Sequence, residues 1–118
     1  MILIVDDQKN MCWILSKVLA EAGFAVVTAA TAAEALALAA HGAVTAAVLD
    51  YRLPDQSGLA LFEALRRCQP QLPAVLITSY GSGQLRDEAL RLGFHAYMDK
   101  PLDNHALIAT LWAVLKES

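Results

Sequence analysis

The fold of this chain is decided by residues 49–58, LDYRLPDQSG. They follow the apolar run 46–48, which is typical of a short buried strand. A strand that ends on Asp50 and continues into a loop with Pro54 and Gly58 places the Asp50 carboxylate at the carboxyl edge of a sheet. In open α/β folds, ligands bind at that edge.

Three further segments place polar side chains in comparable positions. The first apolar run leads into Asp6 and Asp7, a later one leads into Thr78, and Lys100 follows another. A single aspartate at a strand end often only caps the next helix. Four such positions along one chain indicate a site.

Strand and helix patterns alternate along the whole chain. Gly23 and Gly93 mark helix ends, and Thr31 with Glu34 three residues later has the spacing of a capping box. We predict strands at residues 2–6, 24–28, 45–50, 73–78 and 94–98, and helices at residues 8–22, 31–40, about 57–68, 84–92 and about 103–116. This order predicts βαβ crossovers and one α/β domain over residues 1–118, with an open, doubly wound, five-stranded parallel sheet covered on both faces.

Composition excludes several classes of protein. The net charge is −3 and the pI is near 5.5, so we expect no direct binding to nucleic acid, which favours a basic face. Hydrophobic residues make up 57% of the chain, but no apolar stretch approaches the roughly 20 residues of a membrane span. Aspartates interrupt the first apolar run, so it is not a secretory signal. We therefore predict a cytoplasmic protein with no membrane contact.

The cysteines and tryptophans are given no catalytic role. Cys12 and Cys68 are predicted on helices that cover opposite faces of the sheet, too far apart for a disulfide, so we expect free thiols in a reducing compartment. For Trp13 and Trp112 we favour packing roles. The alternatives are a contact with a partner for Trp13, which lies off the apolar stripe of the first helix, and an interface for Trp112. The three histidines, His41, His95 and His105, have no ligand spacing.

The predicted sheet edge has a chemistry of its own. If the first, third and fourth strands lie side by side, Asp6, Asp7, Asp50 and Thr78 meet there. Gathered carboxylates repel one another unless a cation joins them. Either Mg²⁺, which takes oxygen ligands, or the Lys100 ammonium would serve. A metal, a lysine and a hydroxyl around an aspartate are suited to neutralising a transferring phosphoryl group, with Asp50 as nucleophile.

These residues match the motifs of a known family. The motifs are Ile4-Val5-Asp6-Asp7, Leu49-Asp50 with Pro54 and Gly58, Ile77-Thr78-Ser79, and Tyr97 followed by Lys100-Pro101. Over essentially its whole length the chain resembles a response-regulator receiver domain of two-component signalling. Its local sequence is most similar to that of nitrogen-regulator-type receivers. The resemblance implies a flavodoxin-like (βα)5 fold with strand order 2-1-3-4-5.

The resemblance also implies the residues of a phosphorylation site. Asp50 would be the phosphoacceptor. Mg²⁺ would be held by Asp7 directly, by Asp6 through water, by Asp50, and by the backbone carbonyl of Arg52. Thr78 would donate its hydroxyl to the phosphoryl group, helped by the Ser79 amide.

Other roles follow from the same resemblance. Lys100 would pair with a phosphoryl oxygen and would precede a cis peptide bond to Pro101. Tyr97 would be the switch aromatic that turns inward when Thr78 moves toward the phosphoryl group. Arg52 and Tyr80 occupy the two positions that tune phosphoryl lifetime among receivers. Both are bulky, so we expect them to hinder the attack of water and to give a lifetime of minutes or longer.

The resemblance implies partners and leaves the output open. A sensor histidine kinase or a phosphotransfer protein would supply the phosphoryl group. The chain would control transcription, or it would act as a stand-alone relay that passes the group to a phosphotransfer histidine. A homodimer would form through the fourth helix, fifth strand and fifth helix, drawing on Arg86, Arg91, His95, Asp99, His105, Trp112 and Lys116.

Three competing classes fit the residues less well. A Mg²⁺-dependent aspartyl-phosphate hydrolase would need a second acid two residues after the nucleophile, where this chain has Arg52. A flavodoxin-like carrier would need a Ser/Thr/Gly phosphate loop after the first strand, where the acidic pair Asp6-Asp7 would repel the phosphate of FMN. A binding module that is not phosphorylated stays an alternative. We expect no enzyme activity other than phosphorylation and dephosphorylation of the chain's own aspartate.

Overall fold

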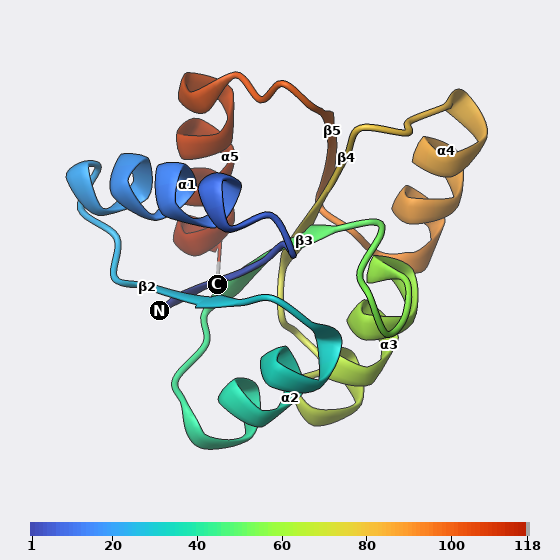
Figure 1. Ribbon diagram of the computed structural model, residues 1–118, viewed down its shortest axis with the longest axis horizontal. Helices are drawn as coiled ribbons and strands as arrows, with labels where there is room; N and C mark the ends of the chain where they lie inside the picture. The colour runs from blue at the N-terminus through green and yellow to red at the C-terminus, as the bar shows by residue number, and fades with distance from the viewer. Residues whose placement is uncertain (118) are drawn as a thin grey trace.

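The computed structural model describes residues 1–117 and shows five strands alternating with five helices (Figure 1). The strands are β1 (Ile2–Val5), β2 (Val26–Ala29), β3 (Ala46–Asp50), β4 (Ala74–Thr78) and β5 (Ala96–Asp99). The helices are α1 (Lys9–Glu21), α2 (Ala32–His41), α3 (Gly58–Cys68), α4 (Gly83–Leu92) and α5 (Asn104–Glu117). All strand pairs are parallel, in the order β2-β1-β3-β4-β5. The predicted fold and strand order are confirmed.

The sheet is covered on both faces, with α1 and α5 on one side and α2, α3 and α4 on the other (Figure 1). Successive strand residues point to opposite faces. In β1, Leu3 and Val5 therefore join the core under α2, α3 and α4, while Ile2 and Ile4 join the core under α1 and α5. Strands β1, β3 and β4 are buried throughout, which explains their unbroken apolar sequence.

Two strands begin two residues later than predicted, and both have the same cause. Gly23 and Gly93 adopt left-handed conformations, with φ of 100° and 110°. The backbone N–H of Phe24 then donates to Leu19 at the end of α1, and that of Phe94 donates to Ala89 at the end of α4. Each phenylalanine thus closes the preceding helix in a Schellman arrangement instead of starting the strand.

The loop between β3 and α3 is fixed at several points. The Asp55 carboxylate accepts hydrogen bonds from the backbone N–H groups of Ala32 (2.9 Å) and Ala33 (3.0 Å), so it caps α2 from a distant part of the chain. At the end of the loop, the backbone N–H of Gly58 donates to the Tyr51 carbonyl at 2.7 Å. The residues that follow Asp50 are therefore held in place on both sides.

Candidate phosphoryl-transfer site

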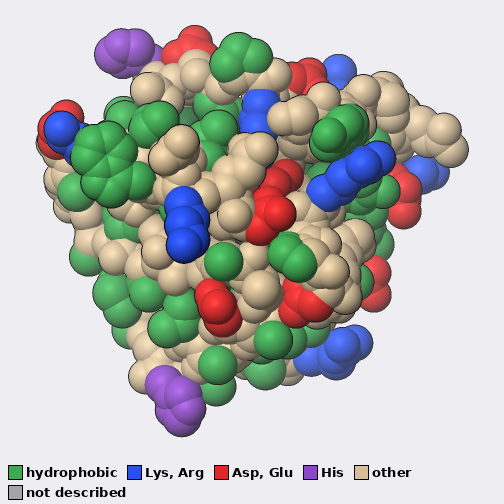
Figure 2. All heavy atoms as spheres, in the orientation of Figure 1, with side chains coloured by type: hydrophobic (Ala, Val, Ile, Leu, Met, Phe, Trp, Pro, Cys, Tyr) green, Lys and Arg blue, Asp and Glu red, His purple; other side chains and the backbone are tan. Residues whose placement is uncertain are grey.

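The carboxyl ends of β1 and β3 bring three carboxylates together. Asp6 follows β1, Asp7 begins the loop to α1, and Asp50 ends β3. One oxygen from each carboxylate lies within 4.8 Å of the others. Asp6 and Asp50 are buried, whereas Asp7 is exposed. Figure 2 shows acidic side chains near the centre of the visible face, with basic side chains to either side.

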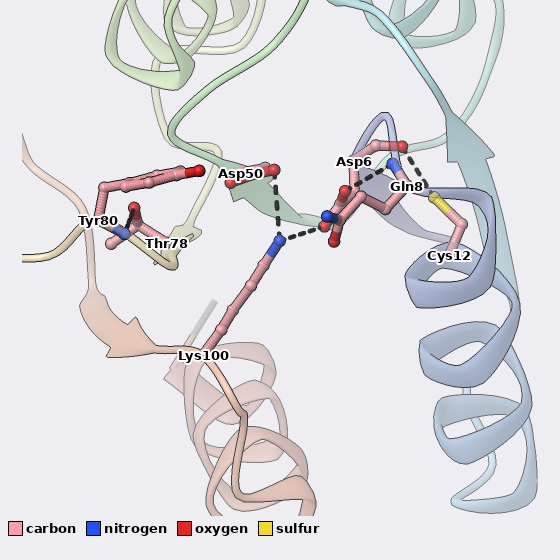
Figure 3. Close-up of polar contacts among 7 residues, drawn as sticks. All are labelled: Asp6, Gln8, Cys12, Asp50, Thr78, Tyr80 and Lys100. Carbon is pink, nitrogen blue, oxygen red and sulfur yellow. Dashed lines mark hydrogen bonds and ion pairs between the residues drawn. The ribbon is translucent and has the colours of Figure 1, made fainter.

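Lys100 joins the two buried carboxylates (Figure 3). Its Nζ lies 2.8 Å from Asp6 Oδ2 and 3.3 Å from Asp50 Oδ2. Burial alone would lower the pKa of Lys100, but the hydrogen bonds and charges of Asp6 and Asp50 outweigh burial and raise it. Lys100 therefore stays charged between them.

The single positive charge of Lys100 does not fully compensate the negative charge of the carboxylates at this site. Burial and the neighbouring charge of Asp6 raise the pKa of Asp50, although Lys100 acts in the opposite direction. The ionised form of Asp50 is therefore disfavoured, and Asp7 adds another negative charge nearby. The three carboxylates supply oxygen ligands of the kind that Mg²⁺ binds, so the donor set fits a hard divalent cation.

Thr78 lies at the end of the neighbouring strand β4 and is 1% exposed. Its hydroxyl oxygen accepts a hydrogen bond from the backbone N–H of Tyr80 at 2.9 Å. In Figure 3 the Tyr80 side chain extends in the direction of Asp50. The Arg52 guanidinium lies 4.0 Å from the centre of the Tyr80 ring. The two residues that we expected to control hydrolysis thus contact each other.

The remaining predicted residues take the following positions. Tyr97 is half-buried, and its hydroxyl donates to Asp99 Oδ1 at 2.9 Å. Ser79 is exposed directly after Thr78. The peptide bond between Lys100 and Pro101 is cis.

Cys12 and Trp13 lie beside the acidic site on α1. The Cys12 Sγ donates to the backbone oxygen of Asp6 at 3.1 Å, and both cysteines are free, as predicted (Figure 3). Burial, with the nearby charge of Asp6, raises the pKa of the Cys12 thiol, so it is not an activated nucleophile. The expectation that Trp13 packs into the domain is wrong, because its side chain is 66% exposed. Trp112 is 42% exposed and packs one side on Phe24, with ring centroids 4.4 Å apart.

Sequence reasoning missed the roles of Asp55 and Gly81, and it placed Asp99 only on the predicted dimer face. Asp55 caps α2 across 23 residues of chain, and Gly81 and Asp99 meet at the Tyr97 hydroxyl. The Pro54-Asp55 pair indicated a loop, but no local signal shows where the Asp55 carboxylate reaches. The same holds for Gly81, whose contact with β5 depends on the tertiary fold.

This fold and this site define a receiver-type α/β domain, and comparisons with known proteins agree. The response-regulator receiver domain family matches residues 2–112, so the chain belongs to this family. It is 30% identical over 117 residues to the transcriptional regulatory protein GlrR of Escherichia coli, covering 99% of this chain and 26% of GlrR. The chain thus spans about a quarter of the length of the first relatives it matches.

Solved structures show the same fold. The receiver domain of NtrX from Brucella abortus superposes with a TM-score of 0.93 at 30% identity, with 100% of each chain covered. This confirms the similarity to nitrogen-regulator-type receivers. A response regulator from Burkholderia pseudomallei with a phosphorylated aspartic acid and a calcium ion gives a TM-score of 0.87 at 29% identity, covering 98% of this chain and 68% of that one. Receiver domains are generally signalling modules without enzyme activity, and a histidine kinase is the partner that the family implies.

The described part of the chain was also searched for membrane segments. Within residues 1–117, no helix has both the length and the apolar character needed to cross a bilayer.

Proposed function

We propose that this chain is a phosphorylation-dependent signalling switch whose phosphoacceptor is Asp50. The observation that carries the proposal is the placement of Lys100 between Asp6 and Asp50, next to a third carboxylate. An Asp50 oxygen attacks the phosphorus of a phosphohistidine, the bond between phosphorus and nitrogen breaks, and the donor histidine leaves with the bond electrons. A sensor histidine kinase or a phosphotransfer protein supplies the phosphoryl group. The phosphorylated aspartic acid of the Burkholderia relative supports this assignment.

We propose Mg²⁺ as the cofactor. Asp7, Asp6 through water, Asp50 and the backbone carbonyl of Arg52 would hold the ion. When bound, Mg²⁺ neutralises negative charge on the phosphoryl oxygens. The three clustered carboxylates support this ligand set.

The protein's own side chains would then report the phosphorylated state. Lys100 leaves its position between the aspartates to pair with a phosphoryl oxygen, and Thr78 turns its hydroxyl from Tyr80 toward the phosphoryl group, helped by the Ser79 amide. Tyr97 follows the movement of Thr78. This is a two-state element whose populations are shifted by a local charge.

We propose a transcriptional output for the switch, because matched relatives such as GlrR are transcriptional regulators. The chain itself would not contact nucleic acid, and residues 1–118 would form one receiver domain. A homodimer through α4, β5 and α5 would pair two outputs. A relay to a phosphotransfer histidine is the alternative output.

Two further points concern location and class. The two free cysteines support a cytoplasmic location. An aspartyl-phosphate hydrolase is disfavoured because Arg52 stands where such an enzyme would need an acid.

Binding of beryllofluoride, a phosphoryl mimic, tests the assignment. Trp13 lines the same cavity as Asp6, so its fluorescence is a direct probe of the site. We expect saturable binding that requires Mg²⁺ in the wild-type chain, and no binding by Asp50→Asn. Binding of equal affinity in Asp50→Asn would contradict the assignment.

We expect Arg52 and Tyr80 to slow hydrolysis of the phosphorylated chain as one unit. A cation–π contact contributes about 0.5–1 kcal/mol at an exposed site, equivalent to roughly two- to fivefold in a rate. Arg52→Ala and Tyr80→Ala should each speed dephosphorylation by about that factor, and the double variant should be no faster than the faster single one. Loss of phosphorylated mass with time measures the rate, with Arg67→Ala, an exposed arginine on α3, as the control. Unchanged rates would refute the role.

A further inference from the structure

The contact between Tyr97 and Asp99 involves two residues on the same face of β5. The Tyr97 hydroxyl donates to Asp99 Oδ1 at 2.9 Å. Burial, together with this hydrogen bond, raises the pKa of Tyr97, so the hydroxyl remains a donor. We propose that Asp99 and Gly81 are positioning residues for Tyr97: with it they form a latch that holds the Tyr97 side chain in its resting position and opposes activation. This inference rests on the proposed switch function.

Gly81 provides the space for this Tyr97 latch. A Cβ atom at residue 81 would lie 1.9 Å from the Tyr97 hydroxyl oxygen and 2.0 Å from Asp99 Oδ1. No side chain fits there while the hydroxyl and the carboxylate keep these positions. Both atoms are at the ends of side chains, so an added methyl group would displace the latch and not the backbone.

The Tyr97 latch is connected to the residue that senses the phosphoryl group. Asp99 pairs with Thr78 in the sheet register, and the backbone N–H of Lys100 donates to the Thr78 carbonyl at 2.8 Å. On the other side, the Thr78 hydroxyl oxygen accepts from the backbone N–H of Tyr80, the residue before Gly81. The latch and the Thr78 hydroxyl are therefore joined through the segment that carries Gly81.

The direction of the effect follows from this connection. When the Thr78 hydroxyl turns to a phosphoryl group, the Tyr80 N–H loses its acceptor and the backbone at residues 80–81 must adjust. The Tyr97 hydroxyl and the Asp99 carboxylate occupy the space where a Cβ of residue 81 would lie, so we infer that this adjustment opens the latch. The latch therefore stabilises the unphosphorylated state relative to the phosphorylated one, and opening it should favour activation.

Two substitutions on opposite sides of the contact test this inference. Asp99→Ala removes the acceptor, and Gly81→Ala fills the space. Each is expected to increase the affinity for beryllofluoride in the presence of Mg²⁺ by roughly three- to tenfold, the scale of one hydrogen bond. Asp87→Ala, an exposed carboxylate on α4, should leave the affinity unchanged.

A background variant separates the latch from other effects of Asp99, which is adjacent to Lys100. Tyr97→Phe removes only the hydroxyl, and Asp99→Ala added to Tyr97→Phe should then change the affinity no further. A full effect of Asp99→Ala in that background would overturn the latch, because it would show action through Lys100. Unchanged or weaker binding of beryllofluoride by both Asp99→Ala and Gly81→Ala, beside normal wild-type binding, would also overturn the latch. The proposed switch function would then still stand. Failure of the wild-type chain to bind beryllofluoride would instead overturn the proposed function and the latch together.

Discussion

Replacing Lys100 with methionine is expected to destabilise the metal-free protein by about 3–5 kcal/mol at neutral pH. The substitution keeps the length of the side chain and removes its charge, which leaves Asp6 and Asp50 buried without a cation. The free energy of unfolding in urea, measured without divalent cations, is the observable. Lys116→Met, an exposed lysine on α5, is the control and should change stability by less than about 0.5 kcal/mol.

The dependence on pH and on a second substitution makes this prediction specific. The pKa of Asp50 in the folded chain already lies above the unfolded value near 3.8, and loss of the Lys100 charge should raise it further. The folded chain then binds protons more tightly than the unfolded chain, so the stability deficit of Lys100→Met should shrink as pH falls through the raised pKa. Asp50→Asn added to Lys100→Met should recover part of the loss. A deficit that is constant with pH and unaffected by Asp50→Asn would show that Lys100 acts only through packing.

Gly58→Ala is expected to lower the free energy of unfolding by about 1–3 kcal/mol, the usual effect of adding a side-chain atom to a closely packed site. A Cβ at residue 58 would lie 2.3 Å from the backbone oxygen of Asp50 and 3.2 Å from the Tyr51 Cα. These are backbone atoms next to the proposed phosphoacceptor, so they cannot rotate away. The displaced backbone should also weaken beryllofluoride binding.

The chain offers a matched control for Gly58. Gly83 is likewise the first residue of its helix, α4, but a Cβ there would meet nothing within 4 Å. Gly83→Ala should therefore be neutral or stabilise the fold by up to about 1 kcal/mol, through helix propensity and a less flexible unfolded chain. Equal thermal stability of the two variants would contradict the close approach of α3 to Asp50.

The sequence predicted the order and type of every element because each carries a strong local pattern. The buried strands β1, β3 and β4 have unbroken apolar runs, and Gly23 and Gly93 end their helices as expected. The starts of β2 and β5 were placed too early because the pattern of apolar residues cannot distinguish a phenylalanine in a strand from one that closes a helix. Trp13 was misplaced for a related reason, since an aromatic beside an apolar stripe can face solvent as well as the core.

At the candidate site, too, some features could be predicted from the sequence and others could not. Asp6, Asp7, Asp50 and Thr78 were predictable because parallel strands bring their carboxyl ends to one edge. The stacking of Arg52 on Tyr80, the capping of α2 by Asp55 and the contact of Gly81 with Tyr97 depend on how loops meet in three dimensions. No spacing in the sequence indicates those contacts.

The most direct test of Asp50 as phosphoacceptor is the intact mass of the chain after incubation with acetyl phosphate and Mg²⁺. We expect the wild-type chain to gain the mass of one phosphoryl group, to gain none when the divalent cation is chelated, and to gain none as Asp50→Asn. Asp87→Asn, an exposed carboxylate on α4, should be modified like the wild type. A wild-type chain that gains no mass, or an Asp50→Asn chain that gains as much as the wild type, would contradict the assignment of this site.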